Sequence, residues 1–393
     1  MSRARWVALA LIAGASVALT ACTAGDVQPT APPSQGQASA PPSTAPDEGD
    51  PVVAWAERTL QTMTLQQKVA STMMLHVPGT DAAAIRAFVD AYQPGGLILM
   101  GDNIGGDIGA VSELVAAITP DKRVPLLIGI DQEGGDVERI RSDSWASAQS
   151  LKFEPPEETE AAFAARSTML DQAGVSVNFG VVADETADPG SFIYRRALGT
   201  TPQESAERVA AAVRGESGKV LTTLKHFPGH GAAPGDSHVS VPSTAMTYDD
   251  WRATAAQPFE AGIDAGAPIV MFGHLAYTSV DPTPASLSAR WHDILRDDLG
   301  FEGITITDDM GMLVNTGLAE YQNPSENVIR ALAAGNSMVL YILGSVDPGT
   351  LITDVAAAVT AGRITQQQLD DAVLKLLVER RHQGADGLPL RRD

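Results

Sequence analysis

The sequence predicts a single parallel α/β barrel of the (β/α)8, or TIM, type. Eight short runs are apolar on both faces, which is the pattern of buried parallel strands. These runs are residues 69–75, 95–100, 126–131, 175–180, 221–227, 268–274, 303–309 and 337–343. Segments of helix-forming composition lie between them, among them 157–174, 202–217 and 325–335. Eight alternations favour a closed barrel over an open doubly wound sheet.

The turn after the third run argues against a nucleotide-binding sheet. Gly129-Ile130-Asp131 is followed by Gln-Glu-Gly-Gly, which has the glycine spacing of neither a dinucleotide fingerprint nor a P-loop. We therefore do not expect a Rossmann domain, and we expect no cofactor.

The first 50 residues predict export and anchoring. Arg3 and Arg5 precede an apolar run that ends at Leu19, shorter than the roughly 20 residues of a bilayer span. The Leu-Thr-Ala-Cys sequence that ends at Cys22 resembles a bacterial lipobox, which implies cleavage after residue 21 and lipidation of Cys22. An ordinary secretory signal with a chance cysteine is the alternative. Residues 22–50, rich in Ala, Pro, Ser and Thr, predict a disordered tether.

We therefore expect an exported protein that a lipid anchor at Cys22 holds on the outer face of the cell membrane. Residues 1–21 form the signal peptide in this interpretation, 51–386 the barrel domain and 387–393 a tail. Thr64 and Gln67 match a capping box that opens one of the first helices of the domain.

The charge balance excludes several classes of partner. The chain has 27 Lys and Arg against 48 Asp and Glu, a net charge of -21. A nucleic-acid surface needs clustered cations, so we expect no nucleic-acid partner, and the same deficit argues against binding anionic lipid through a basic face. Because Cys22 is the only cysteine, no internal disulfide is possible. We expect a monomer.

Polar residues recur at the carboxyl ends of the predicted strands. They are Asp131, Asn178, Lys225 with His226, His274, and Asp308 with Asp309. In TIM barrels the active site is built at this face. An Asp or Asn at one strand end can simply cap the next helix, but five such ends together favour a site.

The densest group of titratable residues lies in the segment 222–242. Its first residues, TTLKHF, read as a strand, and the Gly- and Pro-rich remainder reads as a mobile loop that carries Asp236 and His238. A metal site is conceivable because His226 and His230 are four residues apart. Since Pro228 and Gly229 separate them, they do not share a helical face, and we expect no metal.

Glycoside hydrolysis fits these residue types. It needs a carboxylate on one side of the scissile bond and a proton donor on the other. Asp308 or Asp309 can supply the carboxylate; alternation puts them on opposite faces, and periodicity does not choose between them. A histidine suits proton transfer near neutrality when a partner orients it, and Asp236 is placed to orient His238. The simpler interpretation of Asp236-Ser237-His238 alone is a solvated surface loop.

These motifs together resemble glycoside hydrolase family 3, and more narrowly its bacterial N-acetyl-β-glucosaminidase subgroup. The resemblance rests on KHFPGHG at 225–231 followed by Asp236-Ser237-His238, on IDQEGG at 130–135 with Arg139, and on ITDDM at 306–310. Similar blocks cover nearly everything after residue 52 in the expected order. The resemblance implies a TIM barrel without the second α/β sandwich domain of many family members.

The resemblance also implies a role for each site residue. Asp308 would be the nucleophile of a retaining mechanism, and His238 the acid/base with Asp236 as its partner. The residues expected to bind the sugar are Asp131, Arg139, Arg196, Lys225 and His226, with Arg195 as the alternative to Arg196. The chain departs from the family pattern at Asp136, where arginine is usual, at Gly180-Val181 and at Ser337.

The expected activity is that of an exo-β-N-acetylglucosaminidase releasing terminal GlcNAc from cell-wall fragments. Aromatic residues make up only 5% of the chain, which favours a pocket for one terminal sugar over a long cleft. Phosphorolysis on the same scaffold, a non-catalytic sugar-binding lipoprotein and a metallohydrolase are the alternatives. Gly229, Gly231 and Gly235 predict a loop mobile enough to hold His238 far from the other groups when no ligand is bound.

Overall fold

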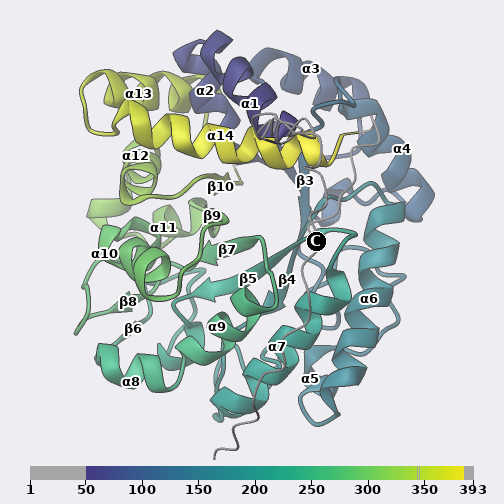
Figure 1. Cartoon of the computed structure of the whole chain (residues 1–393), viewed down its shortest axis with the longest axis vertical. Coiled ribbons are helices and arrows are strands. Elements are labelled where there is room, and N and C mark those ends of the chain that lie inside the picture. Colours follow the sequence, from purple (N-terminus) through teal and green to yellow (C-terminus); the bar gives the residue numbers. More distant parts are fainter. Residues whose placement is uncertain (1–49, 343, 345, 385–393) are drawn as a thin grey trace, which may run out of the picture. The chain divides into compact units, whose positions relative to one another are not determined.

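The computed structural model describes residues 50–342, 344 and 346–384 (Figure 1). The expected signal peptide, Cys22, the tether up to residue 49 and the tail lie outside the described residues. The first described helix, α1 (Pro51–Thr62), begins where the Asp50 carboxylate accepts a hydrogen bond of 2.8 Å from the backbone N–H of Val52. No helix among the described residues is long and apolar enough to span a bilayer.

The predicted barrel is confirmed. Its eight parallel strands are β1 (Met73–Leu75), β2 (Gly96–Leu99), β3 (Leu127–Ile130), β4 (Val177–Val182), β5 (Leu221–Phe227), β7 (Ile269–Phe272), β9 (Ile304–Thr307) and β10 (Val339–Tyr341). They pair in the order β10-β1-β2-β3-β4-β5-β7-β9. A parallel bridge between Ile306 and Met338 joins the two outer strands and closes the ring.

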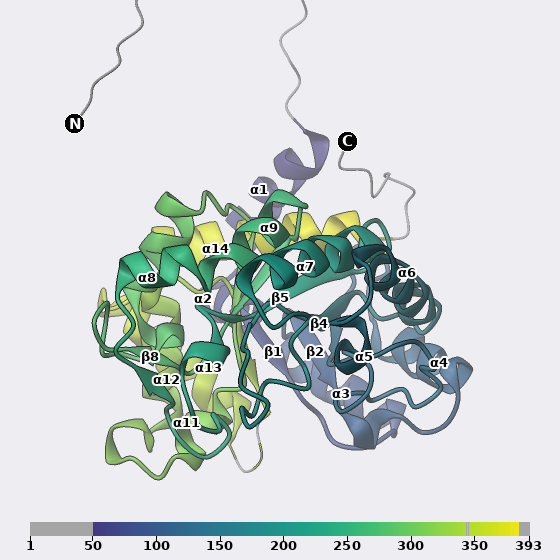
Figure 2. The same cartoon turned by 90° about the horizontal axis from the view of Figure 1, so that it is seen from below.

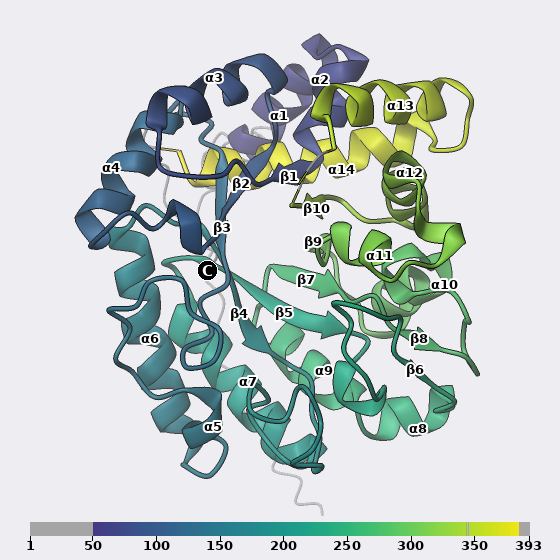
Figure 3. The ribbon, with the colours of Figure 1, turned by 180° about the vertical axis from the view of Figure 1, so that it is seen from behind.

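Helices surround the strands, as the views from the two ends of the barrel and from its side show (Figures 1, 2 and 3). The longer ones are α3 (Ala82–Tyr92), α4 (Ile108–Ile118), α6 (Pro156–Gln172), α7 (Pro202–Glu216), α9 (Ala256–Asp264), α12 (Pro324–Ala334), α13 (Pro348–Thr360) and α14 (Gln366–His382). Shorter helices are α2 (Leu65–Ser71), α5 (Ala148–Leu151), α8 (Tyr248–Ala253), α10 (Ala289–Asp293) and α11 (Gly311–Asn315). The predicted segments 157–174, 202–217 and 325–335 coincide with α6, α7 and α12 within two residues.

One strand boundary was predicted wrongly. Residues 69–71 belong to α2, so β1 is only three residues long. The capping box at Thr64 and Gln67 is present and starts α2, with hydrogen bonds of 3.2 Å and 2.9 Å between the two residues. Val69, Ala70 and Ser71 are buried although helical, so an apolar run on both faces does not by itself distinguish a short buried helix from a strand.

Side chains fill the inside of the barrel. A buried cluster of strand residues, including Met74, Phe179 and Ile306, packs inside the ring. Gly129 is required there, because a Cβ atom at that position would lie 2.7 Å from the ring of Phe179 and 2.9 Å from the sulfur of Met74. The lumen is therefore a packed core, and polar chemistry is confined to the rim where the strands end.

Candidate active site

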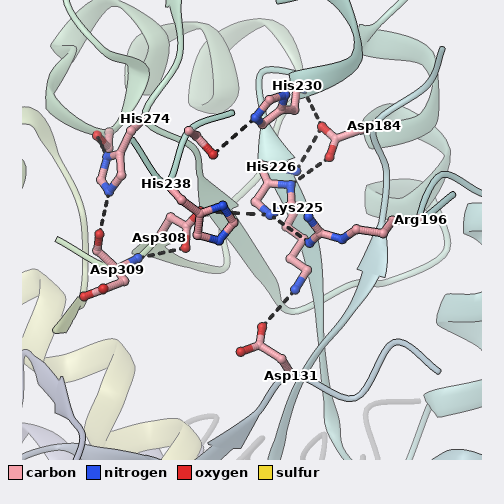
Figure 4. Close-up of polar contacts among 12 residues, drawn as sticks. Asp131, Asp184, Arg196, Lys225, His226, His230, His238, His274, Asp308 and Asp309 are labelled. Carbon is pink, nitrogen blue, oxygen red and sulfur yellow. Dashed lines mark hydrogen bonds and ion pairs between the residues drawn. The ribbon is translucent and has the colours of Figure 1, made fainter. Parts of the chain in front are cut away.

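The carboxyl ends of five strands bring a cluster of charged side chains together at the rim (Figure 4). Asp131 follows β3, Asp184 follows β4, Lys225 and His226 lie near the end of β5, His274 follows β7, and Asp308 with Asp309 follows β9. Asp131, Lys225, His226, His274, Asp308 and Asp309 are thus placed as predicted.

Lys225 is the centre of a buried ion network. Its ammonium lies 2.9 Å from Asp131 and 2.7 Å from Glu133, and only 2% of its side chain is exposed. Burial alone would lower the pKa of Lys225, but the two carboxylates raise it. Burial would likewise raise the pKa of Asp131, yet Lys225 and Arg139 lower it to about 2. Both partners therefore stay charged, and the network presents fixed charges rather than a titrating group.

Two arginines extend this network. Arg139 donates to Asp131 at 3.1 Å, and Arg196 forms a two-point ion pair with Glu133 at 2.9 Å and 2.7 Å. Arg196 also lies 3.5 Å from His226 Nε2. Arg195, the alternative to Arg196, is instead exposed and pairs with Asp136. The structure therefore places Arg196, not Arg195, with the sugar-binding candidates.

A second buried unit fixes His226. Its Nδ1 donates to Asp184 at 2.7 Å, and its backbone N–H donates to the other oxygen of the same carboxylate at 3.1 Å. That oxygen also accepts from the backbone N–H of His230 at 2.5 Å. Burial would raise the pKa of Asp184, but His226 and His230 lower it. With Nδ1 held by Asp184, His226 turns Nε2 toward Asp308, whose Oδ2 lies 4.0 Å away.

The structure distinguishes the two neighbouring aspartates. Asp309 turns its carboxylate onto the backbone, accepting from Gly311 at 3.0 Å and Ile342 at 2.8 Å, while Asp308 faces His226. Burial raises the pKa of Asp309 to about 6 despite these two bonds. Burial would also raise the pKa of Asp308, but His226 and His274 lower it. Asp308 is therefore the carboxylate that is ionised and directed into the cluster, as a nucleophile must be.

Asp236 and His238 form a hydrogen-bonded pair on the loop after β5. His238 Nδ1 and its backbone N–H donate to the same Asp236 oxygen, at 2.7 Å and 2.9 Å. Both side chains are exposed, 58% for His238 and 43% for Asp236. The His238 ring lies 5.6 Å from that of Phe192, and the Phe192 ring lies 5.7 Å from the Arg196 guanidinium of the rim. Figure 4 shows the dyad's histidine with the labelled rim residues. The dyad that the sequence suggested is thus formed, within this loop.

The loop contacts the barrel through His230 and Ser237. The expectation that His238 sits far from the other groups without ligand stays a prediction. Its glycines also have structural roles. Gly229 adopts a φ of 128° and its carbonyl accepts from Tyr277 at 2.6 Å. A Cβ atom at Gly231 would overlap the backbone of Glu185. The strand β6 (Ser243–Thr244), which pairs with β8 (Ala276–Tyr277), fixes the far end of the loop.

Three other residues differ from the sequence interpretation. Asn178 does not join the site, because its amide bonds Glu216 of α7 and the backbone of Gln132. Asp184 and Glu133 were given no role, although both are buried among the charged residues of the rim. Glu133 is part of the IDQEGG motif at 130–135, and Asp184 follows the apolar end of β4, so the sequence contains a weak signal for each.

The metal interpretation of the histidines finds no support in their contacts. His226 Nδ1 is bonded to Asp184, and His230 Nε2 lies 3.2 Å from the Ser237 hydroxyl. Across the described part of the chain, no group of three or more His, Cys, Asp or Glu side chains is arranged to hold a metal ion.

A TIM barrel whose rim carries an ionised carboxylate and a buried network of paired charges, with a histidine–aspartate dyad on a loop, has the groups of an enzyme that cleaves glycosidic bonds. The glycosyl hydrolase family 3 N-terminal domain matches residues 64–378. The chain therefore belongs to glycosyl hydrolase family 3, which confirms the family resemblance. It is a glycoside hydrolase.

The chain is similar to several hexosaminidases. A curated β-hexosaminidase from Nitrosomonas eutropha is 34% identical over 281 residues, 68% of this chain and 79% of that protein. A family 3 β-N-acetylglucosaminidase from Paenibacillus superposes with a TM-score of 0.76 at 29% identity, covering 84% of this chain and 66% of that one. A β-N-acetylhexosaminidase from Beutenbergia cavernae superposes with a TM-score of 0.70 at 27% identity, covering 81% and 98%.

Proposed function

We propose that this protein is a retaining exo-β-N-acetylglucosaminidase that releases terminal GlcNAc from peptidoglycan-derived fragments. Asp308 attacks the anomeric carbon while His238 gives a proton to the leaving oxygen, which leaves a covalent glycosyl-enzyme. His238 then takes a proton from water, which attacks the same carbon and displaces Asp308. Two inversions give net retention of the β configuration.

The observation that carries this proposal is the hydrogen-bonded Asp236–His238 dyad on the loop after β5. A proton-transfer group needs a partner that orients its imidazole and stabilises the imidazolium, and the 2.7 Å bond from His238 Nδ1 to Asp236 meets that need. It also leaves Nε2 for the leaving oxygen. The hexosaminidase and β-N-acetylglucosaminidase names of the relatives support GlcNAc as the sugar.

The buried rim supports recognition of one terminal sugar. Asp131, Lys225 and Arg196 present charged acceptors and donors. Ion pairs fix their positions, between Lys225 and Asp131 and between Arg196 and Glu133. Hydrogen bonds between such groups and sugar hydroxyls are charge-assisted and therefore strong. Arg139 and His226 complete the proposed set, each bonded to a carboxylate that holds it in place.

Product analysis on an aryl N-acetyl-β-glucosaminide tests the proposal. Proton NMR during turnover should show β-GlcNAc first, followed by mutarotation. Addition of inorganic phosphate should leave the products unchanged. Formation of GlcNAc 1-phosphate would identify a phosphorylase instead, and the α anomer as first product would exclude the covalent mechanism. Peptidoglycan fragments with a terminal GlcNAc, compared with chitobiose, test the natural aglycone.

The cell-surface location is part of the same proposal. The lipobox-like sequence at Cys22 and the Pro- and Ser-rich segment after it support a lipid-anchored enzyme on the outer face of the membrane. Cys22→Ser should move the protein from the membrane fraction to the medium. Retention of the variant in the membrane fraction would contradict anchoring through this cysteine.

A further inference from the structure

The ring of Phe192 lies between the fixed rim and the loop that carries the dyad. It is 38% exposed, on the connection between β4 and α7. Its centroid lies 5.6 Å from that of His238, with the rings at 74°, and 5.5 Å from that of His230. The Arg196 guanidinium lies 5.7 Å from the same ring. One exposed aromatic ring therefore contacts both ends of the 230–238 segment and the sugar-binding rim.

The hydrogen bonds of the dyad do not attach it to the barrel. Asp236 and His238 belong to the same loop, so their bond orients the imidazole within the loop but leaves the loop free to move as a unit. His230 is different, because its backbone N–H is bonded to buried Asp184. The Ser237 hydroxyl, between the two dyad residues, lies 3.2 Å from His230 Nε2, which links this part of the loop to the fixed His230. Phe192 is the contact between the rim side and the His238 ring itself.

We propose that Phe192 is a positioning residue that holds the His238 imidazole over the sugar site. This inference rests on the proposed function, since it assigns Phe192 an effect only through the proton transfer of His238. An aromatic pair of this geometry shifts a two-state equilibrium by roughly 2- to 10-fold. Loss of the ring therefore lowers the fraction of enzyme in which His238 can reach the leaving oxygen, while Asp308 and the buried ion network stay in place.

The dependence on the leaving group separates this role from a structural one. We expect Phe192→Ala to lower kcat/KM for a methyl or sugar β-glycoside of GlcNAc about 2- to 10-fold. For a dinitrophenyl glycoside the loss should be smaller, because a good leaving group needs little protonation. Phe192→Tyr, which keeps the ring, should retain the wild-type kcat/KM on both substrates. Phe153→Ala removes another exposed phenylalanine, 67% exposed after α5, and should change neither value.

A double-mutant cycle completes the test. In a His238→Ala background, Phe192→Ala should cause no further loss, because the group through which it acts is gone. Equal losses on both substrates, or additive losses in the double variant, would overturn the proposal. Inhibition by GlcNAc should stay unchanged, and weaker inhibition would show that the ring acts through Arg196 instead. Phe192→Leu replaces Phe192→Ala if the latter does not fold.

The cycle also distinguishes the two proposals. If His238→Ala itself lowers kcat/KM by the same factor for all substrates, the acid role of His238 and hence the proposed mechanism fail. If His238→Ala shows the leaving-group dependence and Phe192→Ala does not, the mechanism stands and the role of Phe192 is wrong.

Discussion

The rim and the dyad loop carry charges of similar kind in opposite surroundings. At the rim, Lys225 and Glu133 are 2% and 3% exposed and each charge has more than one partner. On the loop, Asp236 and His238 are about half exposed and pair with each other. Buried ions are retained only where partners offset the cost of removing them from water, whereas an exposed pair contributes little to stability. The proposed sugar subsite is thus held by buried ion pairs, whereas the proposed acid/base pair is held mainly within its own exposed loop.

This difference fits the two chemical tasks. A subsite and a nucleophile benefit from groups that are fixed in advance, because no reorganisation is then needed during the reaction. An acid/base must reach the leaving oxygen and later a water molecule, and a loop can supply such a group after the sugar is bound. The comparison predicts that substitutions at the rim lower turnover of every substrate. Substitutions on the loop should mainly lower turnover of substrates with poor leaving groups.

The largest effect is expected at Asp308. Asp308→Ala should lower turnover of activated and unactivated glycosides alike by about 10⁴-fold or more, since the covalent step has no substitute nucleophile. Kinetics on nitrophenyl and methyl glycosides measure this. Asp309→Asn is the matched control, because Asp309 is bonded to backbone amides, and it should keep far more activity. A variant of Asp308 that still turns over either substrate at a useful rate would show that the nucleophile lies elsewhere.

His238→Ala should have the next largest effect, and a selective one. General acid catalysis contributes about 10²- to 10⁴-fold, so kcat/KM for a methyl glycoside should fall in that range. For a dinitrophenyl glycoside the fall should be about 10-fold or less. Ser240→Ala removes another polar side chain of the same loop and serves as control. The selective role is contradicted if both glycosides lose activity by the same factor.

The sequence predicted the barrel well because buried parallel strands leave a strong local signal. All eight apolar runs contain a strand, and seven of the predicted ranges differ from the observed ones by no more than two residues at either end. The exception is 69–75, where the buried last turn of α2 precedes β1. A buried turn of three residues is too short to show the amphipathic pattern that normally separates helix from strand.

The site was predicted less completely, and β4 shows why. Its register shifts between Asn178 and Val181, and the strand continues to Val182 instead of ending near residue 180. The residue at the rim is therefore Asp184, while Asn178 lies deeper and contacts α7. A β-bulge changes which side chains face a given side, and nothing in a one-dimensional alternation marks it.

Variants of the rim and of the dyad loop should also differ in stability, although less than they differ in activity. Lys225→Met leaves the buried carboxylates of Asp131 and Glu133 with fewer partners, and we expect a loss of about 3–5 kcal/mol in the free energy of unfolding. Asp236→Asn breaks an exposed pair and should cost less than about 1 kcal/mol. Urea denaturation at pH 7 measures both. Similar losses for the two variants would mean that the rim network is not more tightly coupled to folding than the loop.

The smallest effect is the pH dependence of stability. The contribution of the rim residue Asp309 changes with pH in the opposite direction to that of the loop residue Asp236. Burial raises the pKa of Asp309 from 3.8 to about 6, so its contribution to stability is full below pH 3.8 and is lost as the pH rises through about 6. Burial would raise the pKa of Asp236 too, but its bonds from His238 lower it. Its contribution is therefore present above pH 3.8 and is lost as the pH falls below that value.

We therefore expect the stability difference between wild type and Asp309→Asn to decrease, by at most about 3 kcal/mol, as the pH rises from about 4 to 7. The difference between wild type and Asp236→Asn should change in the opposite direction, at lower pH. Urea denaturation of the three proteins across this range gives both slopes, and subtraction removes the titration of groups common to all. A flat difference for Asp309→Asn would mean that this carboxyl titrates normally. Asp309 would then not be the neutral neighbour that leaves Asp308 as the charged member of the pair in weakly acidic solution.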